Sequence, residues 1–456
     1  MKDYKESTEH FQKIKNKMAI KQQERVGAFI FWAVLAVGFF VSVCLLSLRP
    51  SFSATEKREL TKFPALSLEG LSRGGYTKDI ENWFSDTFPF RDNITDLNAE
   101  LENWRGIHPG NIQIHGDVNE GDEIPDAPDS MQPEVSQAEE VSSLEEVSSE
   151  AAPKDNAPEQ DTQALGAIII AGDAAYEYYH FDKDVSNSYV RALNETANKL
   201  NTAKAYSMIV PNSMDITLNK ATREKIKTSD QKKAIAYMQD SLNEKIKPVP
   251  VFEALKAHMG EYIYFRTDHH WTALGAYYGY VQFMAQRGED AKPLDYYTTK
   301  DYTNFVGAFY ADSGKKPELK RNPDTITTYS PPEKTKLVYK DKSGKEHEWK
   351  LISDVSTWTS SAKYSTFIGG DNPYTVITNE DLTEGKSICI VKESYANAMI
   401  PFLVPHYKSI YVLDYRSYKG SISEFVNSNY VDELLFVNNI SMTRNKSLVS
   451  RLAGLK

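Results

Sequence analysis

Cysteine is scarce in this chain of 456 residues, which contains only two. Both Cys44 and Cys389 lie in apolar runs, where each is expected to be a small buried hydrophobic side chain. Two cysteines exclude a disulfide-stapled scaffold and a zinc site built from several cysteines. An excess of positive charge is also absent, since 53 Lys and Arg stand against 63 Asp and Glu. The net charge of −10 argues against nucleic acid as the main partner, because binding to phosphates needs a basic surface.

Aromatic residues are absent from residues 117–161, although the whole chain has 27 tyrosines. This segment holds 15 acidic residues and one lysine, so it accounts for the negative net charge of the chain. The net charge of the other residues therefore does not distinguish an anionic partner from a neutral one. It cannot bury enough apolar surface to offset the entropy lost on ordering, and we predict that it is disordered. The β-like runs NIQIHGD and AIIIAGD flank it. We therefore predict an acidic insertion in the connection between two strands.

Residues 26–48 form an unbroken run of 23 uncharged, mostly apolar residues. As a helix this run would be about 34 Å long, enough to cross a bilayer core. Residues 1–25 carry seven Lys and Arg and four acidic residues, which favours a cytoplasmic tail. A cleaved signal peptide, the alternative, would have a shorter apolar core and a small-residue cleavage site. We predict a single-pass membrane protein whose residues after the span lie outside the cytoplasm.

Short apolar runs alternate with helical patterns from residue 162 to residue 456. The runs AIIIAG, AYSMIV, YIYF, SICIV, SIYVLDY and ELLFV read as buried strands. Uninterrupted apolar strands that alternate with helices predict an α/β fold with a mostly parallel sheet flanked by helices. Residues 49–116 have helix-like spacing and are predicted to form a helical part of the outer domain.

The sequence TDHHW follows one of these runs and opens a predicted helix, for which Thr267 or Asp268 is the expected N-cap. A carboxylate and an imidazole this close form the orienting half of a catalytic triad, with Asp268 fixing the tautomer of a histidine. His269 and His270 are expected to point in different directions, so one of them serves a given site. A metal site would need further ligands, and the motif lacks the i, i+4 spacing of zinc peptidases, so no metal is predicted. Structural histidines beside a capping aspartate are the remaining alternative.

Ser394 stands directly after the run SICIV and before a predicted helix. A serine in such a strand–turn–helix connection is a candidate nucleophile, because helix N-terminal amides favour developing negative charge. It is equally an ordinary N-cap, and no G-x-S-x-G is present. Asn438 and Asn439 end another predicted strand, where a side-chain amide completes an oxyanion hole or only closes a turn. Arg416 is either a clamp for a substrate carboxylate or a surface charge.

Several motifs together resemble a known family. TDHHW, KESYANAMIPFL, IYVLDYR, FIGGDNP, RELTKFPALS and FSDTFPFRD resemble the DHHW family of membrane-anchored bacterial proteins, which is similar to the SGNH-hydrolase-like proteins of alginate O-acetylation. The resemblance implies a circularly permuted SGNH-hydrolase-like fold. It also implies that Asp268 orients His270 as the general base and that Ser394 is the nucleophile. The chain departs from the family at Glu393, where an aspartate is usual.

The function that this resemblance implies is the O-acetylation of a polysaccharide, without a cofactor. Ser394 would carry the acetyl group, with the Ser394 amide and an asparagine holding the oxyanion, and His269 and Arg416 near the substrate. The acetyl donor would be supplied by a membrane-bound O-acyltransferase, because acetyl-CoA is cytoplasmic. An O-acetyl esterase on the same triad is an alternative, as is a non-catalytic envelope scaffold or glycan-binding protein.

Overall fold

The computed structural model describes Trp32 and residues 49–53, 58–64, 75–89, 113–116, 118, 120–125 and 167–456. The predicted cytoplasmic tail and, apart from Trp32, the predicted membrane span of residues 26–48 lie outside the described residues. So does most of the acidic segment. Within the described part of the chain, no helix is long and apolar enough to cross a membrane. The chain divides into two compact units, residues 1–96 and 97–456. The described elements of the first unit are the antiparallel pair β1 (Phe52–Ser53) and β2 (Arg58–Glu59) and the helix α3 (Gly75–Asp86).

The second unit is built on an eight-stranded sheet of order β11-β10-β12-β14-β13-β15-β6-β7. The strands from β14 to β7 run parallel, whereas β12, β10 and β11 are joined antiparallel. The α/β class is confirmed, but the sheet is mixed rather than mostly parallel. The strands are β6 (Lys204–Val210), β7 (Ile246–Pro248), β10 (Thr335–Lys340), β11 (Glu346–Trp349), β12 (Tyr374–Asn379), β13 (Ser387–Lys392), β14 (Ser409–Asp414) and β15 (Glu433–Asn439).

The difference between the two parts of the sheet follows from burial. β13 is buried along almost its whole length, as is typical of a parallel strand covered on both faces. β12 alternates buried and half-buried residues, the pattern of a strand with one face near solvent. A tight connection that includes Gly344 in the left-handed region (φ 84°) joins β10 to β11, so these two strands form a hairpin.

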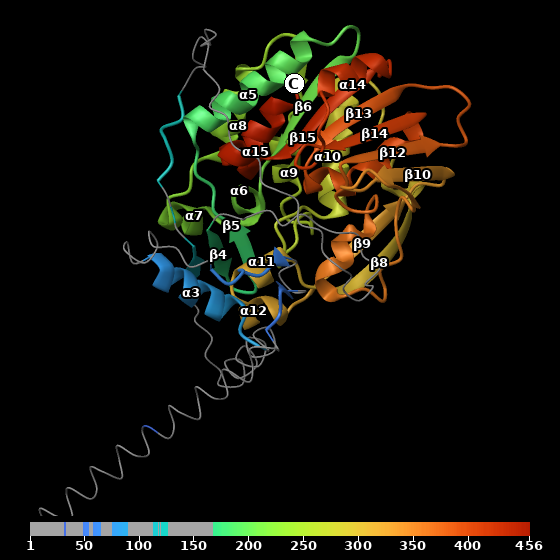
Figure 1. The fold of residues 1–456 in the computed structure, drawn as a ribbon. Helices are drawn as coiled ribbons and strands as arrows, with labels where there is room; N and C mark the ends of the chain where they lie inside the picture. The colour runs from blue at the N-terminus through green and yellow to red at the C-terminus, as the bar shows by residue number, and fades with distance from the viewer. Residues whose placement is uncertain are drawn as a thin grey trace, which may run out of the picture. The chain divides into compact units, whose positions relative to one another are not determined.

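Helices cover both faces of the parallel part (Figure 1). Alternate residues of each strand enter separate cores: Met208 of β6 packs in one core and Ile209 in the other. The first core is completed by α9 (Phe252–Ala257), α10 (Ala273–Arg287) and α13 (Ile400–Leu403). The second is completed by α5 (Lys183–Asn198), α8 (Gln231–Asp240), α14 (Ile422–Ser428) and α15 (Lys446–Gly454).

A separate three-stranded sheet tests the predicted position of the acidic insertion. β3 (Gln113–His115) pairs antiparallel with β4 (Ile168–Ala171), and β4 with β5 (Ala174–Glu177). β3 and β4 are therefore neighbouring strands whose connection contains residues 117–161, as predicted. The remaining helices are α6 (Ser213–Thr217), α7 (Lys220–Ile226), α11 (Ala308–Asp312) and α12 (Pro317–Lys320), and β8 (Thr298–Phe305) pairs with β9 (Asp324–Ser330). The short 3-10 helices are η2 (Leu294–Tyr296), η3 (Ser360–Thr366), η4 (Ser394–Ala398), η5 (Val404–His406) and η6 (Ile440–Arg444).

Candidate functional site

Asp268 and His270, two residues apart, and Ser394, 124 positions further along the chain, form one continuous chain of hydrogen bonds at the carboxyl end of β13. His270 Nδ1 lies 2.5 Å from Asp268 Oδ1, and His270 Nε2 lies 2.7 Å from Ser394 Oγ. All three residues are at most 6% exposed. The structure thus brings together the aspartate, histidine and serine that the sequence singled out, with the distances that proton transfer along a triad requires.

The loop before α10 positions Asp268 and His270. Its backbone closes on itself, since the Thr272 amide donates to the Ile263 carbonyl (2.9 Å) and Tyr264 bridges to Trp271. The N-cap of α10 is Thr272, whose side chain accepts from the Gly275 amide, so the prediction of Thr267 or Asp268 as the cap was wrong. Asp268 is instead turned back towards the site.

The Trp271 side chain links this loop to the turn that carries Ser394. Its indole N–H donates to the Tyr395 carbonyl at 2.8 Å, and Tyr395 directly follows Ser394. Trp271 itself is completely buried. The tryptophan of the TDHHW motif therefore fixes the distance between His270 and Ser394.

Asp268 is held as an ionised carboxylate. Its Oδ1 accepts from the His270 amide and ring, and its Oδ2 accepts from the Ala308 amide at 2.9 Å. Burial by itself raises the pKa of Asp268, but the neighbouring His270 and His269 and these hydrogen bonds outweigh it and lower the pKa below the ordinary value. An ionised Asp268 can only accept, so it favours the His270 tautomer with a proton on Nδ1, which leaves Nε2 as an acceptor for the Ser394 hydroxyl.

Close packing also fixes Asp268. A Cβ placed on Gly307 would lie 2.2 Å from Asp268 Oδ2, so only glycine permits the approach of this backbone to the carboxylate.

Glu393 connects the turn that carries Ser394 to the neighbouring strand β15. Its Oε2 accepts from the Tyr395 amide (3.0 Å), its Oε1 accepts from the Asn439 amide (2.8 Å), and Ser394 Oγ lies 3.3 Å from Oε2. Burial raises the pKa of Glu393. Ser394 begins the five-residue 3-10 helix η4 rather than a longer α-helix. The Glu393 side chain thus joins the ends of β13 and β15.

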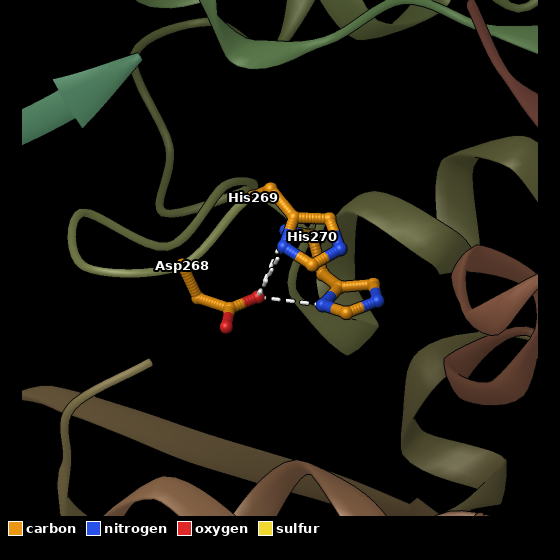
Figure 2. A group of neighbouring side chains, drawn as sticks. All are labelled: Asp268, His269 and His270. Atoms are coloured by element: carbon orange, nitrogen blue, oxygen red, sulfur yellow. Dashed lines mark hydrogen bonds and ion pairs between the residues drawn. The ribbon is translucent and has the colours of Figure 1, made fainter. Parts of the chain in front are cut away.

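The rings of His269 and His270 both lie beside the Asp268 carboxylate (Figure 2). His269 is not part of the hydrogen-bonded chain that joins Asp268, His270 and Ser394. The two ring centroids are 3.9 Å apart, and His269 Nδ1 is 3.8 Å from Asp268 Oδ1. Neither ring nitrogen of His269 has a hydrogen-bond partner among the described residues. Burial lowers the pKa of His269 to about 3, so its ring is neutral at physiological pH.

The two asparagines at the end of β15 face opposite sides of the sheet. Asn438 Nδ2 donates to the Tyr189 hydroxyl of α5 at 3.1 Å. Asn439 is joined through its backbone amide to Glu393, and its Nδ2 is buried without a partner in the described part of the chain. The Asn439 Oδ1 accepts from the Ser441 amide at 2.6 Å, so this side chain caps η6.

Arg416 is buried in a group of charges rather than exposed on the surface. It donates twice to Asp414 (2.9 and 2.6 Å) and once to Asp371 (2.9 Å), and Lys392 Nζ contacts the same two carboxylates at 3.0 and 2.7 Å. We call Lys392, Arg416, Asp371 and Asp414 the ion-pair cluster. Its neighbours include Asn397 of η4, which donates to Asp371 at 2.9 Å.

Sequence reasoning missed two residues that hold this region. Tyr364 stacks on His270 with ring centroids 3.9 Å apart, and Asp371 joins both cations of the ion-pair cluster. Asp371 follows three residues in the left-handed region, Ile368 to Gly370, with φ of 51°, 74° and 81°. The glycine pair in FIGGDNP was the available signal for such a turn, whereas nothing in the sequence around Tyr364 indicated that its ring meets a histidine.

A metal ion is an alternative occupant of this site, because one ligand atom each of Asp268, His269 and His270 lies within 4.8 Å of the others. The geometry fits a hydrogen bond better. Both ring nitrogens of His270 are engaged by Asp268 and Ser394. Asp268 Oδ1 and His270 Nδ1 are 2.5 Å apart. Two ligand atoms that each lie about 2.0–2.2 Å from one metal ion in tetrahedral geometry are farther apart than this.

Comparison with known proteins agrees with this fold. The model of the DHHW protein family matches residues 56–156 and 145–413, which is well over half of the chain. A DHHW family protein from Eubacterium siraeum is 28% identical with a TM-score of 0.57, over 63% of this chain and 94% of that chain. Bacillus cereus PatB1, solved with a sulfonyl adduct, is 20% identical with a TM-score of 0.53, over 63% of this chain and 98% of that chain.

A further similarity is to an O-acetyltransferase domain. The O-acetyltransferase domain of Pseudomonas putida AlgJ matches 63% of this chain and 99% of its own, but 9% identity and a TM-score of 0.34 are too low to bear on the site. No curated protein matches the chain.

Proposed function

The chain belongs to the DHHW protein family, as its motifs predicted, and on that basis we propose that it is a membrane-anchored acyltransferase that O-acetylates a cell-surface or secreted polysaccharide. The observation that carries the proposal is the hydrogen-bonded chain from Asp268 through His270 to Ser394. The scaffold in this proposal is a circularly permuted SGNH-hydrolase-like fold, in which the nucleophile strand β13 comes late in the chain.

The reaction has two halves that use the same residues. In the first, Ser394 Oγ attacks the acyl carbonyl carbon while His270 Nε2 takes the hydroxyl proton, and the bond to the leaving group breaks as His270 returns that proton to it. In the second, a sugar hydroxyl gives its proton to His270 and attacks the acyl-enzyme carbonyl. The acyl–Ser394 bond then breaks, and Ser394 regains the proton. Asp268 stabilises the imidazolium in both halves.

Asn439 is the better candidate for the side-chain donor of the oxyanion hole. The amide of Asn438 is already bonded to Tyr189 on the opposite face of the sheet, whereas Asn439 Nδ2 is buried with no partner among the described residues. A buried amide without a partner is costly, and an oxyanion would satisfy it.

The acetyl donor in this proposal comes from a membrane-bound O-acyltransferase, since acetyl-CoA is cytoplasmic and the triad lies outside. Residues 26–48 would anchor the chain with residues 1–25 in the cytoplasm. Protease added to intact spheroplasts should then remove the part after the span and leave the tail. Protection of the whole chain would contradict this orientation.

The test of the function is acetyl transfer from a chromogenic ester to an oligosaccharide. Ser394→Ala should lower the rate by about a thousandfold or more, because the nucleophile is lost. Ser423→Ala is a matched control, since Ser423 is a buried serine of α14 outside the site. A sulfonyl fluoride gives a second readout, because it should label wild type once and Ser394→Ala not at all. Equal transfer rates in wild type and Ser394→Ala would contradict the proposal.

A further inference from the structure

We propose that Tyr364 is a positioning residue that holds the His270 ring in place and stabilises the positive charge that this ring gains during acyl transfer. The inference rests on the proposed function and adds to it a residue outside the triad. It is drawn from the rings and hydrogen bonds around His270.

The His270 ring lies between two other rings. Tyr364 stacks on it at a centroid distance of 3.9 Å and an interplanar angle of 17°, and His269 lies against it at the same distance and 35°. No ring contact joins His269 to Tyr364 in the described part of the chain, so the two rings cover different faces of His270. The imidazole is therefore held against tilting in both directions.

Tyr364 is itself fixed from several sides. It is 1% exposed, and its hydroxyl donates to the Ser394 carbonyl at 3.1 Å, so one side chain contacts both the base and the backbone of the nucleophile. The 3-10 helix η3 that carries Tyr364 is tied to β8, because Lys363 Nζ donates to the Thr303 carbonyl and Ser360 Oγ donates to the Asn304 carbonyl at 2.7 Å. Tyr364 therefore cannot follow His270 if the histidine moves.

The stack favours the charged form of the imidazole. The face of an aromatic ring carries negative electrostatic potential, which attracts a cation above it, most strongly where water is excluded. The attraction grows when His270 takes the proton of Ser394, so it is stronger in the transition state than in the resting enzyme. The ring on the other face does not oppose this charge, because burial lowers the pKa of His269 to about 3 and keeps it neutral.

Two substitutions separate the ring from its hydroxyl. Tyr364→Leu keeps an apolar side chain but removes the aromatic face, and we expect kcat to fall about tenfold with KM unchanged. Tyr364→Phe keeps the face and loses the bond to Ser394, and we expect kcat within about threefold of wild type. The acidic limb of the pH–rate profile should move to lower pH in Tyr364→Leu and stay in place in Tyr364→Phe. The titratable groups that face His270 are common to both variants: Asp268 and His269 of its own loop, Glu393 at the N-cap of η4, and Tyr395 of η4.

The control is Tyr206→Leu, which removes a buried tyrosine ring from β6 that packs on Phe283. It should lower the melting temperature as Tyr364→Leu does but leave kcat and the pH profile of the folded protein unchanged. If Tyr364→Leu behaves like this control, the positioning role is wrong although the proposed function stands. If wild type itself transfers no acetyl and is not labelled by the sulfonyl fluoride, the proposed function has failed instead.

Discussion

The ion-pair cluster and the triad both lie buried at the carboxyl end of β13, but their charges are balanced in different ways. In the ion-pair cluster two cations face two carboxylates. Burial opposes the charge on Lys392 and on Asp371, yet the opposite charges outweigh it, so the pKa of Lys392 is raised and that of Asp371 is lowered. All four groups are therefore held in one ionised state.

The triad has one carboxylate, Asp268, and an imidazole, whose other ring nitrogen lies within hydrogen-bond distance of the Ser394 hydroxyl. When the Ser394 proton moves to His270, ionised Asp268 pairs with the imidazolium, and the negative charge passes from Oγ to the oxygen of the attacked carbonyl. Lys392 and Ser394 are only two residues apart, so one strand end supplies both a member of the ion-pair cluster and the proposed nucleophile. Fully paired charges hold the side chains of the ion-pair cluster in one arrangement. The proposed reaction instead needs a side chain that can gain and lose a proton, as His270 does.

Asp268→Asn should have the largest effect on the reactive side of this comparison. The amide no longer enforces the Nδ1 tautomer of His270 or stabilises the imidazolium, so kcat for acetyl transfer should fall about 10⁴-fold with little loss of fold. Steady-state transfer rates and a thermal melt measure the two quantities. Asp215→Asn, at a buried carboxylate paired with Arg223 away from the triad, is the control and should keep kcat. A loss below about tenfold in Asp268→Asn would show that Asp268 has no catalytic role.

Lys392→Met should show the opposite profile, with stability lost first. It leaves two buried carboxylates with Arg416 as their only cation in the ion-pair cluster, and the free energy of unfolding should fall by about 3–5 kcal/mol. Chemical denaturation at pH 7 measures this. Lys386→Met removes a half-exposed lysine that pairs with Glu289 and should cost less than about 1 kcal/mol. Similar losses in the two variants would mean that the cluster does not support the fold.

The pH dependence of stability gives a smaller effect that belongs to the site alone. The pKa of His269 is lowered by burial to about 3, so below pH 6.5 the unfolded chain binds a proton that the folded chain does not. The stability that neutral His269 provides is complete above pH 6.5 and is lost as the pH falls towards 3. Between pH 7 and pH 5 wild type should lose about 2 kcal/mol more than His269→Gln, as measured by urea denaturation. The pKa values of Asp371 and Asp414 in the ion-pair cluster are lowered, so these carboxylates stay ionised over this pH range. Equal losses of stability in wild type and His269→Gln would mean that a group other than His269 causes the pH dependence.

Some of the site could be predicted because it is encoded in short segments. Asp268 and His270 are two residues apart, and Ser394 directly follows Glu393 at the end of an apolar strand, so their residue types and local positions were readable. The strands β6, β13, β14 and β15 were predicted for the same reason, since uninterrupted apolar runs indicate burial on both faces.

Other predictions failed where distant contacts overrode local pattern. The run YIYF was expected to be a strand, but its backbone bonds to its own loop, with the Phe265 amide directed to the His270 carbonyl and only Tyr264 forming an isolated bridge. The run AIIIAG is a strand, but it pairs in the small sheet with β3 and β5 instead of the main one. The spacing of apolar residues in a strand predicts that the strand is buried, but it does not predict which strand it pairs with.

The sequence by itself determined the α/β class, the place of the acidic insertion between two strands, and the residue types of the triad, because each depends on contiguous or nearly contiguous residues. Only the tertiary structure decided that His270 meets Ser394, that Tyr364 covers the imidazole, and that Arg416 is neutralised by buried carboxylates. Those contacts join residues tens to more than a hundred positions apart, or depend on the direction of a side chain at a strand end. They are set by how the sheet and its covering segments pack, which no local spacing records.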